Sequence, residues 1–226
     1  MTLKAVLFDV DFTLVRPGPE LGPDGYVRLA RRHGLELDAS SYAEARAKAL
    51  ETLRRHPELL HDEEIWIAFS ERIVRGMGGN SDAARQIAVE IERAWEVSEN
   101  FDLYEDVVPV LDELRRNGLK IGLVSNGARE IDEFVRHHGL TVDAAVGSRT
   151  HGKVKPDPSI FLAALERLGV AAEETIMVGD TLEDDIEGAR AVGIRAMLID
   201  REGQHPDIAG RLTDLYALPE ALGLQV

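Results

Sequence analysis

Two aspartates separated by one residue follow the first apolar stretch of the chain. Residues 5–8 are apolar, as in a buried strand, and Asp9 and Asp11 come directly after them. Because side chains two apart on an extended backbone point the same way, we expect the two carboxylates to leave the strand as a pair. Proteins keep such repelling charges together where a cation or proton is shared, or where the carboxylates do chemistry. Taken alone, the stretch is better explained as a strand followed by an acidic turn.

Three further polar groups follow later apolar stretches. A hydroxyl, an amide and a glycine at 125–127 suit contact with an anion, since glycine lets backbone N–H groups come close. A loop then carries Lys153 and Lys155, and four carboxylates lie within 180–185. Taken one at a time, each group has an ordinary explanation: residues 125–127 fit a turn, the two lysines fit a solvated loop, and residues 180–185 fit the acidic start of a helix.

The elements that must position these groups alternate between strand and helix. Such alternation predicts an α/β fold with a doubly wound, Rossmann-like parallel sheet. In these sheets ligands bind beyond the carboxyl ends of the strands, which is where all the polar groups fall. The tail 203–226 has no clear assignment. The predicted strands are 5–8, 119–124, 142–146, 175–178 and 196–199, with helices at 106–118, 130–138, 160–168 and 185–191.

Between the first strand and this alternating part, the pattern is helical throughout. Four helices are expected, beginning near Asp24, Ser41, Asp62 and Ser81, and Ser41 with Glu44 matches a capping box. We therefore predict a smaller all-helical cap domain at 16–97, and a catalytic core made of 1–15 and 98–226.

Composition narrows the classes of protein. A hydrophobic fraction of 44% in 226 residues supports a large core, and the absence of cysteine excludes disulfides and thiolate metal sites. A formal charge of −15 argues against nucleic-acid and membrane partners. With no signal-peptide pattern and no apolar run of membrane-spanning length, a cytoplasmic protein is expected.

Together and in this order, the polar groups resemble the four motifs of the haloacid dehalogenase-like (HAD) hydrolase superfamily. The matching residues are Asp9 to Thr13, then Ser125, Lys155, and Gly179-Asp180 with a later aspartate. The resemblance covers about 1–15 and 98–200, and the helical insert occupies the place of the family's cap. It implies a phosphatase that acts on a small phosphorylated metabolite, as a monomer or homodimer.

The resemblance also implies a role for each site residue. Asp9 would attack phosphorus to form an aspartyl phosphate, Asp11 would act as general acid and base, and Lys155 would pair with Asp9 and the phosphoryl group. The residues implied in holding Mg²⁺ are Asp9, Asp11 through its main chain, Asp180 and Asp185. Those implied in binding phosphate are Thr13, Ser125, Asn126 and Gly127.

Some assignments stay open at this point. Asp184 and Asp185 both qualify as the later aspartate, and the run at 185–189 favours Asp185; Lys153 competes with Lys155, which the following proline favours. The chain also departs from the family at Phe12, where glycine is common.

Single residues distinguish the alternative activities that occur within the superfamily. Dehalogenases lack the second aspartate, so Asp11 argues for phosphoryl chemistry, and a phosphonatase needs a cap lysine, for which Lys48 is the one candidate at 16–97. A sugar-phosphate mutase would keep all four motifs. Outside enzymology, the chain could be an inactive phosphometabolite-binding or scaffold protein, although a scaffold has no need to hold these repelling groups together.

Overall fold

The computed structural model describes residues 2–54, 63–127 and 129–224, and the chain divides into two compact units. One unit, here called the sheet unit, comprises the residues up to Arg16 and those from Asp102 onward. The other, called the helical unit, spans Pro17–Phe101. The chain therefore passes between units after residues 16 and 101, against 15 and 97 expected from the sequence.

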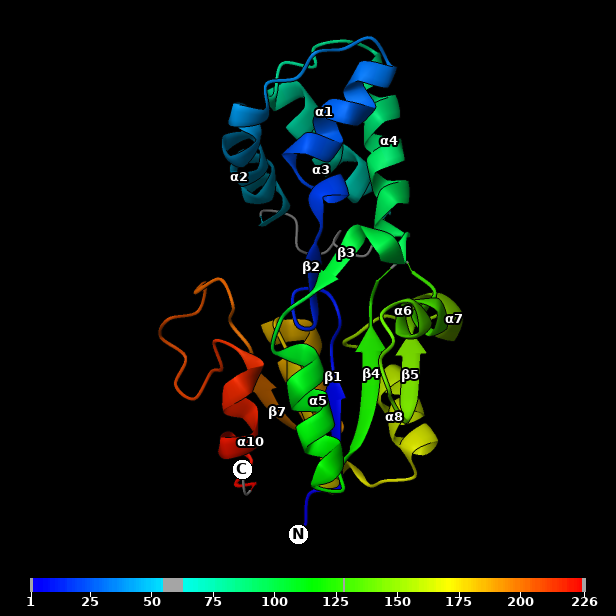
Figure 1. Ribbon diagram of the computed structural model, residues 1–226, viewed down its shortest axis with the longest axis vertical. Helices are drawn as coiled ribbons and strands as arrows, with labels where there is room; N and C mark the ends of the chain where they lie inside the picture. Colours follow the sequence, from blue (N-terminus) through cyan, green and yellow to red (C-terminus); the bar gives the residue numbers. More distant parts are fainter. Residues whose placement is uncertain (1, 55–62, 128, 225–226) are drawn as a thin grey trace. The chain divides into compact units, whose positions relative to one another are not determined.

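The sheet unit is built on five parallel strands in the order β5-β4-β1-β6-β7 (Figure 1). The prediction of a doubly wound α/β fold is confirmed. The strands are β1 (Ala5–Phe8), β4 (Lys120–Ser125), β5 (Ala144–Gly147), β6 (Thr175–Gly179) and β7 (Arg195–Leu198).

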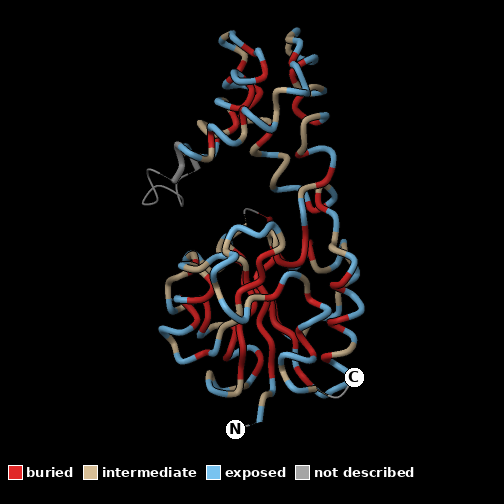
Figure 2. The backbone as a smooth tube through the Cα atoms, turned by 90° about the vertical axis from the view of Figure 1, so that its left-hand side faces the viewer, coloured by how far each residue is buried: buried red, intermediate tan, exposed pale blue. Residues whose placement is uncertain are grey.

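Helices cover both faces of this sheet. Ala5 and Leu7 pack with the buried side of α8, and because neighbouring residues on a strand face opposite sides, Val6 and Phe8 face the other layer, where α5 lies (Figure 1). β1, β5 and β6 are buried along their whole length and β4 beyond its first residue, whereas only the last residue of β7 is buried (Figure 2). The helices of this unit are α5 (Val107–Arg116), α6 (Ile131–His137), α7 (Ser148–His151), α8 (Pro158–Leu168), a π-helical turn (Leu182–Glu187), α9 (Gly188–Ala191) and α10 (Leu218–Ala221).

The sheet register brings three chain segments to one edge. β1 lies between β4 and β6, with Phe8 opposite Leu123 on one side and Val178 on the other. The backbone N–H of Asp9 continues the ladder by donating to the Val178 carbonyl at 2.9 Å. The residues that directly follow these strands are therefore neighbours in space, although those after β1 lie more than a hundred residues from the other two groups in the sequence.

The helical unit has its own apolar core. Its helices are α1 (Pro23–Arg32), α2 (Tyr42–Arg54), α3 (Glu63–Gly76) and α4 (Ala83–Trp95). Residues from these helices, among them Tyr26, Ile73 and Ile87, form one buried cluster. The helix start predicted at Asp62 lies outside the described residues. No helix in the described part of the chain combines the length and apolar character needed to cross a bilayer.

The predicted capping box at Ser41 is wrong. Ser41 lies in a 3₁₀ turn, Ala39–Ser41, and its hydroxyl donates to Asp38 at 2.9 Å. Glu44 instead pairs with Lys48, one helical turn further along, at 2.5 Å. Asp38 accepts three hydrogen bonds from the turn, because its carboxylate is a stronger acceptor than a serine hydroxyl.

A two-stranded sheet, which the sequence did not lead us to expect, forms where the chain passes from one unit to the other. It pairs β2 (Val15–Pro17) with β3 (Phe101–Leu103). Each strand has three residues, which is too short for a periodicity to be recognised in the sequence.

Candidate active site

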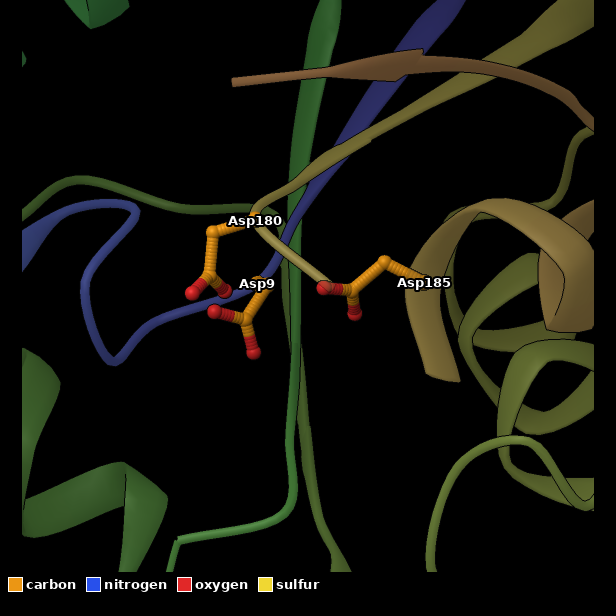
Figure 3. Close-up of side chains that lie close together, drawn as sticks. All are labelled: Asp9, Asp180 and Asp185. Carbon is orange, nitrogen blue, oxygen red and sulfur yellow. The ribbon is translucent and has the colours of Figure 1, made fainter. Parts of the chain in front are cut away.

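Three aspartates from separate segments converge beyond the carboxyl ends of β1 and β6. Asp9 follows β1, Asp180 follows β6, and Asp185 lies in the π-helical turn. One carboxylate oxygen from each residue lies within 4.8 Å of the other two. Figure 3 shows the three side chains directed toward a common space. Asp9 and Asp185 are buried and Asp180 is partly buried, so bulk water does little to screen their repulsion.

Lys155 supplies the positive charge next to this cluster. Its ammonium donates to Asp9 at 2.5 Å and to Asp185 at 2.6 Å, and its side chain is 2% exposed. A buried lysine is retained where carboxylates compensate its lost hydration. Lys153, the sequence competitor, is exposed. The structure thus brings Lys155, and not Lys153, to the aspartates.

The pKa values of the cluster respond to burial and crowding. Burial raises the pKa of Asp9 to about 7, with the Lys155 ammonium working against the rise and the Asp185 charge adding to it. The pKa of Asp180 is also well above its usual range, through burial and then through the charges of Asp9 and Asp185. Burial acts to lower the pKa of Lys155, but the nearby Asp185 and Asp9 outweigh it and raise this pKa.

Asp185 is held in place by its own loop. Its Oδ2 accepts hydrogen bonds from the Thr181 backbone N–H at 3.0 Å and from the Thr181 hydroxyl at 2.7 Å. A Cβ at Gly179 would lie 2.3 Å from the Asp185 carboxyl carbon, so only glycine leaves room for this side chain. The π-helical turn, a form frequent at functional sites, makes this section wider than an α-helix. Thr181 was not among the residues predicted for the site.

Asp184 faces a different partner. The Asn126 side-chain amide donates to Asp184 at 3.2 Å, whereas Asp185 lies with Asp9 and Asp180. Of the two aspartates left open by the sequence, the structure therefore brings Asp185 to the carboxylate cluster.

The Asn126 side chain fixes the backbone that carries Lys155. Its Oδ1 accepts from the Lys155 N–H at 2.7 Å and its Nδ2 donates to the Lys155 carbonyl at 3.0 Å. These two hydrogen bonds join the loop after β4 to the loop that carries Lys155. Because both polar atoms of the side chain are used, the backbone N–H of Asn126 is the group that remains for binding phosphate. The positioning role of the amide side chain was not predicted.

Ser125 and Gly127 form a tight polar turn after β4. The Ser125 hydroxyl accepts from the Gly127 N–H at 3.0 Å, which leaves the hydroxyl hydrogen to be donated to an anion. Thr13, the other predicted phosphate contact, is fully buried, and its hydroxyl has no hydrogen-bond partner among the described residues. Its carbonyl accepts from Arg201 at 2.9 and 3.1 Å, which ties the loop after β1 to the chain beyond β7.

Asp11 does not belong to the three-aspartate cluster, although its charge acts on Asp9, and it forms an ion pair with Arg129. Arg129 is 4% exposed, and sequence reasoning missed it. A signal was present, because an arginine four residues after Ser125 lies in a loop that follows a strand of the sheet.

Phe12 occupies the position where a glycine was noted as common. It has φ 60°, which makes it the one non-glycine residue with positive φ in the described part of the chain. This left-handed conformation costs a side-chain-bearing residue about 1–2 kcal/mol relative to the right-handed form. The turn that joins Asp11 to Thr13 requires it, since the Phe12 N–H donates to the Val15 carbonyl at 2.7 Å.

This donor set fits a hard divalent cation. Three carboxylates share one space with a single ammonium, so the negative charge there exceeds the positive charge beside it. Oxygen ligands of this kind suit Mg²⁺ better than softer metals, which favour sulfur and imidazole.

Comparison with protein families gives one match over most of the chain. A model described as haloacid dehalogenase-like hydrolase matches residues 3–193. The matched range contains every predicted site residue, the whole helical unit and the sheet unit up to the residues before β7.

Individual proteins give the same picture. The chain is 32% identical over 223 residues to glyceraldehyde 3-phosphate phosphatase of Methanopyrus kandleri, which covers 94% of this chain and 90% of that protein. It is 32% identical over 234 residues to phosphoserine phosphatase of Thermus thermophilus, covering 91% of each. Among solved structures, a HAD phosphatase from Thermococcus onnurineus matches with 30% identity and a TM-score of 0.64, over 99% of this chain and 100% of that one.

Proposed function

The chain belongs to the haloacid dehalogenase-like hydrolase family as one of its phosphatases, and we propose that it is a Mg²⁺-dependent hydrolase of small phosphate monoesters. The observation that carries this proposal is the meeting of Asp9, Asp180 and Asp185 with the Lys155 ammonium at the carboxyl edge of the sheet. Such a group combines an oxygen nucleophile with sites for positive charge, which are what transfer from a phosphate dianion requires.

Asp9 is the nucleophile in the proposed mechanism. One of its carboxylate oxygens bonds to phosphorus, the bond from phosphorus to the ester oxygen breaks, and the departing oxygen takes a proton from Asp11. Water then attacks the aspartyl phosphate, giving a proton to Asp11 as the bond from Asp9 to phosphorus breaks. Inorganic phosphate leaves, and both carboxyl groups return to their starting state.

Asp9, Asp180 and Asp185 are the residues proposed to hold Mg²⁺, with the main chain at Asp11 completing the protein ligands. When bound, the ion would neutralise charge on the phosphoryl oxygens. Lys155 would hold Asp9 in position and then pair with the transferring group. The Ser125 hydroxyl and the backbone N–H of Asn126 would donate to a phosphoryl oxygen, and Gly127 would hold the Ser125 hydroxyl in place through its own N–H.

The proposed substrate is a small phosphorylated metabolite. The two relatives described above are named for glyceraldehyde 3-phosphate and phosphoserine, both small phosphate monoesters. We propose that the helical unit acts as the cap that selects among such esters. The absence of nucleic-acid and membrane partners, a monomeric or homodimeric state and a cytoplasmic location stay predictions from sequence.

The alternatives are less well supported. Lys48, the candidate for a phosphonatase, has a side chain 74% exposed and paired with Glu44, whereas a Schiff-base lysine needs a lowered pKa, which burial provides. A sugar-phosphate mutase would share every group discussed here and differs in its product. An inactive binding protein would gain nothing from the repulsion among the aspartates.

A turnover screen tests the proposal. Purified protein is given a panel of phosphorylated metabolites with Mg²⁺ or with EDTA, and released inorganic phosphate is measured. We expect Mg²⁺-dependent release from at least one small ester, loss of release in Asp9→Asn, and little change in Asp112→Asn, which makes the same substitution at an exposed position of α5. Turnover of Asp9→Asn near the wild-type level would remove Asp9 as nucleophile, and a rearranged phosphosugar without free phosphate would indicate a mutase.

A further inference from the structure

The ion pair between Arg129 and Asp11 is not explained by the roles described so far. Nη2 of Arg129 donates to Oδ1 of Asp11, which is 25% exposed, while the arginine is 4% exposed. The guanidinium carbon also lies 5.5 Å from the centre of the buried Phe134 ring. The guanidinium therefore donates to a carboxylate and lies near a buried aromatic ring.

Burying an arginine in this way is costly. The guanidinium loses hydration, which an exposed ion pair largely keeps, and the long side chain loses about 2 kcal/mol of rotamer entropy. In exchange, a planar guanidinium orients the carboxylate that it binds, because its N–H donors have fixed directions. Burial of Arg129 thus lowers the stability of the fold, while its hydrogen bond holds one oxygen of Asp11 in a defined place.

The second oxygen of Asp11 is directed elsewhere. A Cβ built on Gly127 would lie 3.0 Å from Oδ2 of Asp11, 3.1 Å from the Ser125 hydroxyl and 3.3 Å from Nη2 of Arg129. These three polar groups therefore border one small space beside Gly127. Arg129 donates to Oδ1, while Oδ2 and the Ser125 hydroxyl both border this space, where the phosphoryl group is proposed to bind.

We propose that Arg129 is a positioning residue that orients Asp11 for proton transfer to the leaving oxygen. The inference rests on the proposed function, in which Asp11 is the general acid and base. Arg129 acts through Asp11 and does not itself contact the ester. Its contribution consequently depends on how strongly the leaving group needs a proton, because a well-oriented acid helps a poor leaving group and does little for a good one.

Two substrates with different leaving groups test this. Glycerol phosphate releases an alkoxide that must be protonated, whereas 2,4-dinitrophenyl phosphate releases a stable anion. In Arg129→Met we expect kcat/KM for glycerol phosphate to fall at least about tenfold more than for the dinitrophenyl ester, as part of the roughly 10²–10⁴-fold effect of general acid catalysis. Arg129→Lys keeps one charged donor, so the extra fall in its kcat/KM for glycerol phosphate should be smaller than that in Arg129→Met.

A double-mutant comparison separates positioning from direct binding. If Arg129 acts through Asp11, adding Arg129→Met to Asp11→Ala should change turnover of either ester little further. The control is Arg149→Met, which removes an exposed pair with Glu130 and should leave the ratio of the two rates unchanged.

Three results would overturn the inference. Equal losses on both esters, or a further large loss in the Asp11→Ala background, would assign Arg129 to phosphate binding or to folding. Should Arg129→Met not fold, a ratio for Arg129→Lys equal to wild type would refute the role. If Asp11→Ala itself shows no preference for the dinitrophenyl ester, the acid role of Asp11 fails, and with it the part that we assign to Arg129.

Discussion

The raised pKa of Asp9 predicts that the metal-free protein loses stability as pH rises. In the folded protein this pKa is about 7, whereas the ordinary value is 3.8. Between these values the folded state holds a proton that the unfolded chain has released, so the free energy of unfolding falls with pH. Between pH 5 and pH 8 this amounts to roughly 3 kcal/mol, because the slope of about 1.4 kcal/mol per pH unit halves near pH 7 and the loss levels off above it. Asp180, also raised, acts in the same direction.

Urea unfolding in EDTA measures the effect. We expect the wild-type free energy of unfolding, followed by far-ultraviolet circular dichroism, to drop by about 3 kcal/mol more than that of Asp9→Asn between pH 5 and pH 8. Tryptophan fluorescence is unsuitable, because both tryptophans, Trp66 and Trp95, lie in the helical unit. Asp112→Asn is the charge-matched control.

Magnesium should reverse the trend. At pH 8 the Asp9 carboxylate is ionised and can bind the cation, whereas at pH 5 a proton competes for the same oxygens. The stabilisation produced by added Mg²⁺ should therefore be larger at pH 8. Parallel stability curves for wild type and Asp9→Asn in EDTA would refute the reasoning, because the titrating group would then not be Asp9.

Three further substitutions test how the site is held. Gly179→Ala should weaken Mg²⁺ binding, measured by calorimetry, by about 10–100-fold, since the new methyl would displace the Asp185 carboxylate; unchanged affinity would contradict this. Asn126→Ala should lower the free energy of unfolding by about 1–3 kcal/mol, as it leaves the N–H and carbonyl of Lys155 without these bonds, and an equally stable variant would show that water replaces them. Phe12→Gly should change stability by less than about 1 kcal/mol in urea unfolding, because relief of the left-handed strain is offset by the entropy of glycine; a large loss would mean that the Phe12 ring itself stabilises the turn.

The sequence allowed the fold and much of the candidate site to be predicted. Apolar runs of strand length, each followed by polar residues, placed the carboxylate pair, the Ser125 turn and the later aspartates at one end of a parallel sheet. This worked because a strand carries its signal in consecutive residues, and the end of a parallel strand defines an edge of the sheet. The choice of Asp185 and Lys155 over their neighbours relied on the family resemblance.

Other features depend on contacts between distant parts of the chain. Arg129 and Asp11 are paired although 118 positions separate them in the sequence, and Asn126 binds the backbone of Lys155, 29 positions away. No local sequence pattern indicates either contact. The same holds for the pairing of β2 with β3 and for the helix α10 in the tail that the sequence left unassigned.

The amino-acid sequence by itself determined which residues end each strand, and so which chemical groups reach the edge of the sheet. The tertiary structure alone decided which of these groups touch, because β1 lies between β4 and β6 and each side chain then takes the partner that best offsets its lost hydration. Asp9 meets Lys155, Asp11 meets Arg129, and the site takes its character from these two pairs.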